Sequence, residues 1–205
     1  MSDTRPSIEA IMRTAPVIPV LVIDDAAKAR PLAEALVKGG LRVLEVTMRT
    51  PAALDAIREM KQVPGAIVGA GTVVNTQQFE QVMKEDAEFI VSPGLTDKLG
   101  DAIVRSGVPY LPGIANAGDI MRGLDLGLSH FKFFPAETSG GLKALKALAA
   151  PFYQAKFCPT GGISLASAPE WLAFDPVLCV GGSWIASGSL EEVEAKAREA
   201  AALVR

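Results

Sequence analysis

The stretch VLEVTMRTPAALDAIREMKQ, residues 43–62, contains one complete strand–helix unit. Its first part, VLEVTM (43–48), has the apolar and β-branched residues that strands favour. Thr50 follows as a candidate N-cap, and Pro51 suits the first position of a helix. Apolar residues then recur at a spacing near 3.6. This stretch therefore predicts a strand that leads directly into an amphipathic helix.

The same unit recurs along the chain, and the strand-like runs start roughly every 20 to 25 residues. Eight alternating strand–helix units predict a parallel sheet of the α/β class, and eight can close into a (β/α)8 TIM barrel of about 200 residues. An open doubly wound sheet is the alternative, but no G-x-G-x-x-G opens the first helix. The runs are VIPVLVI (17–23), VLEVTM (43–48), AIVGAGTV (66–73), EFIVSPG (88–94), VPYLPGI (108–114), HFKFFP (130–135), KFCPTGGI (156–163) and VLCVGGSWI (177–185).

The intervals between these runs have helical patterns and helix-end signals. Residues 26–40 form one such interval, which stops at Gly39-Gly40, and another starts at Thr96 and ends at Gly107. An extra helix over residues 6–14 precedes the first strand. We find no linker and no low-complexity segment, so the sequence predicts a single domain over residues 1–205. Further helical intervals are 50–62, 116–127, 141–151 and 190–204.

Composition excludes several classes of protein. The 205 residues are 49% hydrophobic and 21% charged, with a formal net charge of −3. There is no basic surplus to bind nucleic acid or an anionic membrane, and no apolar run approaches the roughly 20 residues of a membrane span. The polar N-terminus lacks the apolar region of a secretory signal. Cys158 and Cys179 lie in apolar runs and are expected to be buried thiols in a reducing cytoplasm.

Charged residues lie in the second strand, on the face that a barrel turns inward. Side chains alternate along a strand, so Glu45 and Arg49 share one face, while Leu44 and Val46 suit the face that packs on helices. Active sites of such barrels lie at the C-terminal ends of the strands. A simple ion pair is one interpretation. A base and an anion clamp at the barrel mouth is the interpretation we favour.

A second unusual charge is Lys132, which lies between Phe131 and Phe133 in the sixth run. Lysine is seldom fully buried. If its face is inward, Lys132 meets Glu45. Apolar surroundings then favour the neutral amine, which attacks ketones and forms a Schiff base, whereas the carboxylate favours the ammonium form. A salt bridge without chemistry therefore stays open. His130, deeper on the same face, is expected to be structural.

Glycine-rich loops follow the third, seventh and eighth runs. VGAGT (68–72) lets the backbone approach closely and places a hydroxyl at the rim. PTGGIS (159–164) and VGGSWI (180–185) each combine two glycines with a hydroxyl residue. Free backbone N–H groups bind phosphate, and barrel phosphate sites lie in the loops after strands 7 and 8. Tight turns without a ligand are the alternative. Pro93-Gly94 and Pro112-Gly113 end the fourth and fifth runs, where they are expected to set turn geometry.

Together these motifs resemble the KDPG aldolase family (2-keto-3-deoxy-6-phosphogluconate aldolase, with 4-hydroxy-2-oxoglutarate aldolase activity). The resemblance covers nearly the whole chain without a departure at a motif position. It is carried by LEVTMRTPAALDAI, IVGAGTV, FIVSPGL, LPGI, FKFFPAETSGG, FCPTGGIS and VLCVGGSWI.

The resemblance implies a class I aldolase on a (β/α)8 barrel, without a metal or other cofactor and usually a homotrimer. It implies a phosphorylated keto acid as substrate, a role in the Entner-Doudoroff pathway and a cytoplasmic location. Lys132 would form the Schiff base, and Glu45 would transfer protons. The resemblance also implies the substrate contacts. Arg49 and Thr72 would bind the carboxylate, Pro93 and Phe134 would lie near the pyruvyl group, and Thr160 would lie near the hydroxyl. The phosphate would be bound by Gly161, Gly162 and Ser183.

Two other functions fit part of these residues. A phosphosugar isomerase or epimerase would use Glu45 and the glycine loops but no covalent lysine. A non-catalytic phosphosugar-binding module would need the loops alone. A metal-dependent aldolase is disfavoured, because the chain has one histidine.

Overall fold

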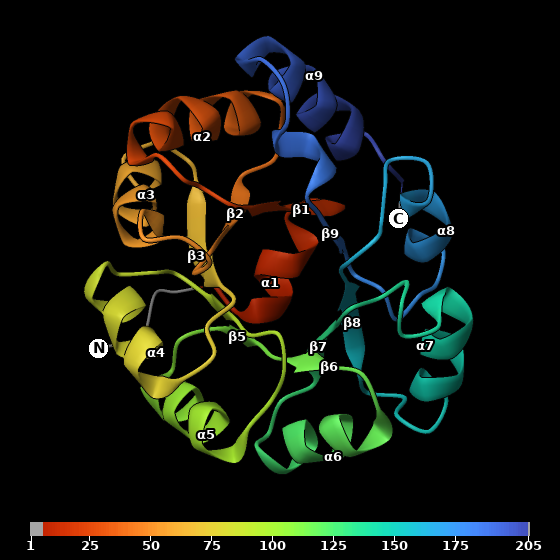
Figure 1. Ribbon diagram of the computed structural model, residues 1–205. Helices are drawn as coiled ribbons and strands as arrows, with labels where there is room; N and C mark the ends of the chain where they lie inside the picture. Colours follow the sequence, from red (N-terminus) through yellow and green to blue (C-terminus); the bar gives the residue numbers. More distant parts are fainter. Residues whose placement is uncertain (1–5, 205) are drawn as a thin grey trace.

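The computed structural model describes residues 6–204, so the N-terminal stretch on which the prediction about a secretory signal rests lies partly outside them. Within this range helices form a ring around a curled sheet (Figure 1). All strand pairs are parallel, as the alternation predicts. The strands are β1 (Val17–Leu21), β2 (Val43–Thr47), β3 (Ile67–Gly71), β4 (Ile90–Val91), β5 (Tyr110–Leu111), β6 (Gly113–Ile114), β7 (His130–Phe133), β8 (Lys156–Pro159) and β9 (Val180–Gly182).

The strands are arranged in two hydrogen-bonded groups that follow one another around the ring. Their orders are β5-β4-β3-β2-β1-β9 and β6-β7-β8. Pro112 separates β5 from β6, so the single predicted run at 108–114 becomes two short strands, because proline has no N–H for the ladder. Isolated parallel bridges, Phe157 to Val177 and Thr160 to Gly181, link β8 to the β9 segment. The sheet is therefore curled and not flat.

Helices follow most strands and pack on the outer face of the sheet (Figure 1). The helices are α1 (Ile8–Arg13), α2 (Ala29–Lys38), α3 (Ala53–Met60), α4 (Thr76–Lys84), α5 (Asp97–Ser106), α6 (Ala117–Asp125), α7 (Gly141–Ala149), α8 (Ala168–Leu172) and α9 (Leu190–Ala201), with short 3-10 turns η1 (Ala26–Lys28) and η2 (Trp184–Ala186). The predicted helical intervals each contain one of these. The sequence patterns did not delimit α4 and α8. Among the described residues, no helix is long and apolar enough to cross a membrane.

Two threonines that share a predicted role behave differently. Thr96 accepts a hydrogen bond from Leu99 N–H at the start of α5, and Gly107 ends that helix with a positive φ of 75°, as predicted. The N-cap prediction for Thr50 is wrong, because α3 begins at Ala53 and Ala52 precedes it. The Thr50 hydroxyl instead donates to the carbonyl of Ile23, 2.5 Å away after β1.

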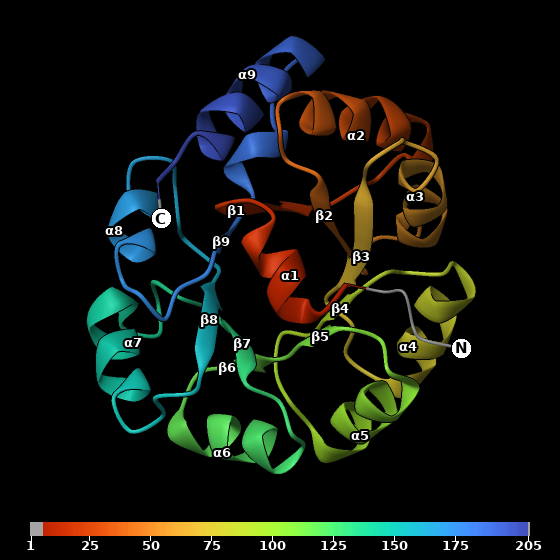
Figure 2. The ribbon, with the colours of Figure 1, turned by 180° about the vertical axis from the view of Figure 1, so that it is seen from behind.

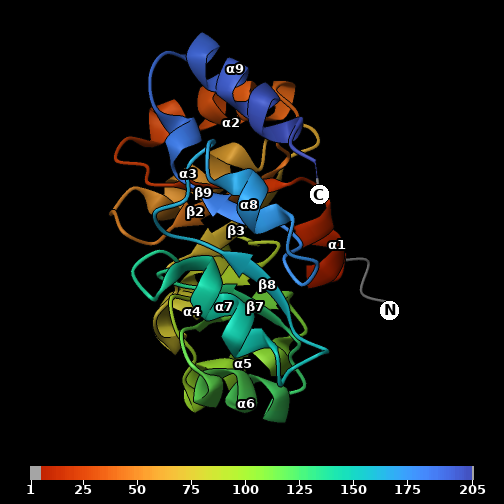
Figure 3. The same cartoon turned by 90° about the vertical axis from the view of Figure 1, so that its right-hand side faces the viewer.

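The interior of the ring has its own apolar cluster. It is separate from the outer cluster, which lies between the sheet and the helices. This inner cluster contains Ile11, Met12, Ile18, Val43, Phe89, Val91, Leu111, Cys158, Leu178 and Cys179. Ile11 and Met12 come from α1, which lies across one end of the strands (Figure 2). The side view places α1 at the same end as the C-terminus of the chain (Figure 3). The start of the strands is therefore filled with apolar side chains, and the opposite end is left for loops.

Candidate active site

Lys132 and Glu45 meet inside the ring. Phe131 and Phe133 pack in the outer cluster, so Lys132 between them points inward. Val43 is in the inner cluster, so Glu45, two residues further along β2, points inward as well. The Lys132 Nζ donates to Glu45 Oε1 over 3.0 Å, and each residue is only 3% exposed. The structure thus brings together the two predicted catalytic residues.

This pair is costly to bury, which separates it from the surface ion pairs. Removing both charges from water costs several kcal/mol per ion, and attraction between them offsets the cost only with good geometry. The Phe134 ring adds a favourable contact, with its centroid 5.3 Å from Lys132 Nζ. Gly71 leaves the space for the Glu45 carboxylate, since a Cβ at this position would collide with Glu45 Oε1. A buried lysine and carboxylate in contact provide a nucleophile beside a proton acceptor.

Arg49 and Thr72 form a polar rim above the pair. Arg49 follows β2 and is exposed, and its Nε donates to Thr72 Oγ1 over 3.2 Å. Thr72 has a φ of 56°, a left-handed conformation that is unusual for a β-branched residue. Such strain persists only where the surroundings fix it, and it is frequent at functional sites. A guanidinium and a hydroxyl held together at the rim suit an anionic carboxylate.

Two of the glycine loops, residues 159–164 and 180–185, meet beside this rim and enclose a cavity of about 110 Å³. Gly161 and Gly162 have φ values of 105° and 83°, which L side chains adopt only with strain. Thr160, which is 6% exposed, lies at the start of the first loop. The cavity is lined by Val20, Arg49, Phe134, Thr160, Gly161, Gly162, Ile163, Gly181 and Ser183.

Three residues that line this cavity were not among the predicted site residues. Val20 shares the inward face of β1 with Ile18, so strand alternation was a sufficient signal. Gly181 lies against Thr160, because a Cβ there would collide with the Thr160 hydroxyl. Ile163 follows the two glycines of its loop, and only the folded loop places it at the cavity.

Pro93 is a predicted substrate-binding residue that does not line this cavity. It lines a separate hollow of about 310 Å³ with Val73, Val74 and Leu95. Its backbone nevertheless packs against Gly113, which is the register partner of Lys132. Behind it, Ser92 Oγ lies 2.6 Å from both the Gly94 carbonyl and the Tyr110 hydroxyl. Burial raises the pKa of Tyr110 to about 12, although the hydrogen bond with Ser92 opposes the shift.

His130 lies deeper than Lys132 on the same strand. Its Nδ1 is 3.1 Å from the Ser129 hydroxyl, and its Nε2 is 3.7 Å from Glu9 Oε2 on α1. Burial lowers the pKa of His130, while the Glu9 carboxylate acts in the opposite direction. These contacts join β7 to α1, as a structural histidine would. Cys158 and Cys179 are both buried, as predicted. Within residues 6–204, no group of three His, Cys, Asp or Glu side chains is placed to hold a metal ion.

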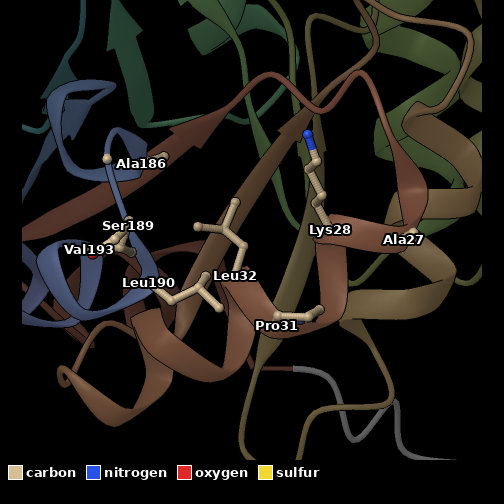
Figure 4. Close-up of a pocket in the computed structure, with 9 residues that line it drawn as sticks. Ala27, Lys28, Pro31, Leu32, Ala186, Ser189, Leu190 and Val193 are labelled. Atoms are coloured by element: carbon tan, nitrogen blue, oxygen red, sulfur yellow. The ribbon is translucent and has the colours of Figure 1, made fainter.

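A larger cavity, of about 480 Å³, lies between α2 and α9 (Figure 4). Pro31 and Leu32 of α2 face Leu190 of α9, and Lys28 stands at the edge. Unlike the cavity at the glycine loops, this cavity is lined by none of the predicted site residues. Size alone therefore does not identify the reactive site, and the polar groups around Lys132 do.

Comparison with known proteins agrees with this geometry. The model of the family "KDPG and KHG aldolase" matches residues 8–200. The chain is 57% identical to the 2-dehydro-3-deoxy-phosphogluconate aldolase of Zymomonas mobilis over 97% of both chains, and 50% identical to the KHG/KDPG aldolase of Escherichia coli over 98% of this chain and 97% of that one.

Solved structures are similar over the same extent. The aldolase of Zymomonas mobilis with 3-phosphoglycerate superposes with a TM-score of 0.95 at 57% identity, covering 97% of this chain and 96% of that one. The KDPG aldolase of Legionella pneumophila, with pyruvate captured as a covalent carbinolamine intermediate, gives a TM-score of 0.93 at 42% identity over 96% and 99% of the two chains. The chain belongs to the KDPG and KHG aldolase family.

Proposed function

We propose that this protein is a class I aldolase that cleaves 2-keto-3-deoxy-6-phosphogluconate to pyruvate and glyceraldehyde 3-phosphate, and that it also acts on 4-hydroxy-2-oxoglutarate. The observation that carries the proposal is the buried contact of 3.0 Å between Lys132 and Glu45. Lys132 Nζ also lies 5.3 Å from the ring centroid of Phe134, which lines the cavity at the two glycine loops. The relatives named for this activity support it, as does the covalent pyruvate intermediate in the Legionella pneumophila protein.

The first half of the reaction makes the covalent intermediate. Glu45 accepts a proton from the Lys132 ammonium, and the free amine attacks the C2 ketone to give a carbinolamine. Loss of one water gives a protonated imine. The short distance between the two side chains lets one carboxylate take the proton from the amine and return it to the leaving hydroxyl.

The second half breaks the carbon–carbon bond. Glu45 removes the proton of the C4 hydroxyl, the C4 oxygen becomes the aldehyde carbonyl, and the electrons of the C3–C4 bond move into the imine to form an enamine. Glyceraldehyde 3-phosphate leaves. Protonation of the enamine at C3 and addition of one water then release pyruvate and the Lys132 amine. Atoms and charge balance, because the water lost in the first half returns in the second.

The remaining residues are assigned to binding. Arg49 and Thr72 are proposed to hold the substrate carboxylate, and Pro93 and Phe134 to pack near the pyruvyl group. Thr160 would meet the substrate hydroxyl. The phosphate would bind at the glycine loops of residues 159–164 and 180–185, through Gly161, Gly162 and Ser183, because backbone N–H groups of such loops can bind phosphate. Binding the phosphate away from the reacting carbon orients the bond that breaks.

The architecture that we propose is a single (β/α)8 barrel domain over residues 1–205, in which α1 is an additional helix across the N-terminal ends of the strands. The bridges between β8 and the β9 segment support closure of the barrel. The contribution of Ile11 and Met12 to the inner cluster supports the placement of α1. A homotrimer, a cytoplasmic location and a role in the Entner-Doudoroff pathway remain predictions from the family resemblance.

Trapping the imine tests the proposed function. We would incubate the protein with pyruvate and borohydride and locate the adduct by peptide mass spectrometry. Reduction of the imine leaves a stable secondary amine, which we expect on Lys132. The Lys132→Ala variant should give no adduct, whereas Lys143→Ala, a change at an exposed lysine of α7, should give the wild-type yield. Folded wild-type protein without an adduct would favour a phosphosugar isomerase or a binding module.

A further inference from the structure

Glu137 lies directly behind the loop that holds Gly161 and Gly162. Its backbone N–H donates to the Gly161 carbonyl over 3.1 Å, and the N–H of Ala136 donates to the Thr160 carbonyl over 2.8 Å. These bonds tie the segment after the Lys132 strand to the loop after β8. The loop carbonyls are thereby occupied from behind, which fixes the peptide planes that carry the loop N–H groups.

The Glu137 side chain makes a second connection, to α8. The Trp171 Nε1–H donates to Glu137 Oε1 over 3.3 Å, and Trp171 is only 3% exposed. The same indole packs against Phe133, with ring centroids 6.4 Å apart. Trp171 is therefore fixed by the outer core and holds the carboxylate in one place. An indole N–H that is buried needs such an acceptor.

The stem of Glu137 also lies against Gly162. A Cβ at Gly162 would come within 2.5 Å of Glu137 Cγ, and the φ of Gly162 is 83°. The loop therefore keeps its left-handed conformation with the glutamate stem packed against it. A carboxylate next to a phosphate site is electrostatically unfavourable, so its presence here calls for another role. The hydrogen bond from Trp171 supplies this role.

We propose that Glu137 and Trp171 are positioning residues for the phosphate end of the site. Neither lines the cavity. They act by holding Gly161 and Gly162 in the conformation that presents their N–H groups. This inference rests on the proposed function, because it takes the glycine loop to be the phosphate-binding end. It predicts a defect that depends on the phosphate group of the ligand and leaves the chemistry at Lys132 intact.

Three variants test the inference. Glu137→Ala removes the acceptor and the stem, and Trp171→Phe removes the donor but keeps a ring beside Phe133. Glu137→Gln keeps an oxygen acceptor and the length of the side chain, and it serves as the conservative control. Thermal unfolding of each variant shows that it is folded. Glu137 is exposed, so its replacement removes little buried apolar surface.

The readout compares ligands with and without phosphate. Loss of one hydrogen bond corresponds to about a fivefold change. We expect Glu137→Ala and Trp171→Phe to raise KM for the phosphorylated substrate by about fivefold with kcat nearly unchanged, and to leave KM for 4-hydroxy-2-oxoglutarate at the wild-type value. Glu137→Gln should behave like the wild type. Equal losses on both substrates, or no change on either, would overturn the inference.

A binding measurement separates this inference from the proposed function. Calorimetry with 3-phosphoglycerate, used as a non-reacting phosphate ester, needs no turnover. We expect Kd to rise by about the same fivefold in Glu137→Ala and to be restored in Glu137→Gln. A wild-type protein that binds this probe but forms no borohydride adduct would reject the aldolase and retain the positioning role. Unchanged Kd in Glu137→Ala would reject the positioning role even if the adduct forms.

Discussion

The two halves of the ring interior use the same strands but hold opposite chemistry. Near α1 the inward side chains are apolar, as Val43 of β2 shows, and the cluster is closed by Met12. Two residues further along the same strand, Glu45 is buried against Lys132. One step of the strand repeat therefore separates a packed core from a buried ion pair. Burial of the apolar side chains stabilises the fold and so offsets the free-energy cost of burying the two charges.

The largest effect is expected from a change on the polar side of this boundary. Glu45→Gln removes the proton acceptor but keeps the size of the side chain. We expect kcat for cleavage to fall by about 100-fold to 10,000-fold. Steady-state kinetics with an aldehyde-coupled assay measures the loss.

Its matched control lies on the apolar side, two positions away on the same strand. Val43→Ala should lower the free energy of unfolding by removing buried methyl groups, with kcat of the folded protein close to the wild-type value. If both changes reduce kcat alike, the boundary between the halves is not a functional one.

The second prediction concerns replacement of the buried ion pair by apolar side chains. Lys132→Met leaves the Glu45 carboxylate buried without its partner, and we expect a loss of about 3–5 kcal/mol in the free energy of unfolding. Adding Glu45→Leu should recover most of this loss, while activity stays absent. Urea denaturation measures both variants. If Lys132→Met alone is as stable as the wild type, the pair is better solvated than its burial indicates.

A smaller effect is expected where a glycine makes room for the pair. Gly71→Ala places a Cβ against Glu45 Oε1, so the carboxylate has to move away from Lys132. Because misplacement of a catalytic group by about 1 Å can cost up to a hundredfold in rate, we expect kcat to fall by about tenfold to a hundredfold. Borohydride trapping should become slower but remain confined to Lys132. An unchanged kcat would place the carboxylate outside the proton transfer.

The smallest effect concerns His130, on the apolar side of Lys132. Because burial lowers its pKa in the folded protein, the unfolded chain takes up the proton first as the pH falls through about 6.5. The stability linked to neutral His130 is therefore present above that pH and is lost progressively as the pH falls toward the lower, folded-state pKa.

We expect the free energy of unfolding to decrease more between about pH 7.5 and pH 5.5 in the wild type than in His130→Asn. Urea denaturation across this range, on both proteins in parallel, isolates the histidine from the carboxylates. Parallel pH curves for the two proteins would contradict the prediction.

Strand alternation was enough to predict the faces of the strands. Glu45 was placed inward because side chains alternate with a period of two, and the same rule put Lys132 on the face opposite Phe131 and Phe133 without deciding whether that face is inward. Local signals failed where a distant group competed. Thr50 looked like the N-cap that Thr96 is, but the Ile23 carbonyl lies within reach of the Thr50 hydroxyl.

Some features of the site were beyond such rules. Pro93 lines a hollow separate from the cavity of the glycine loops, and Ile163 lines that cavity. Which side of a loop faces a cavity depends on the surrounding elements, since a loop has no periodicity to read.

The sequence by itself determined the alternation of strands and helices, the inward position of Glu45 and the family resemblance, because these depend on short-range patterns. Only the tertiary structure decided that Lys132 and Glu45, 87 positions apart, meet at 3.0 Å. It also decided that Glu137 reaches both Gly161 and Trp171. The physical reason is that such contacts depend on the register and curvature of the whole sheet, and no single segment encodes these.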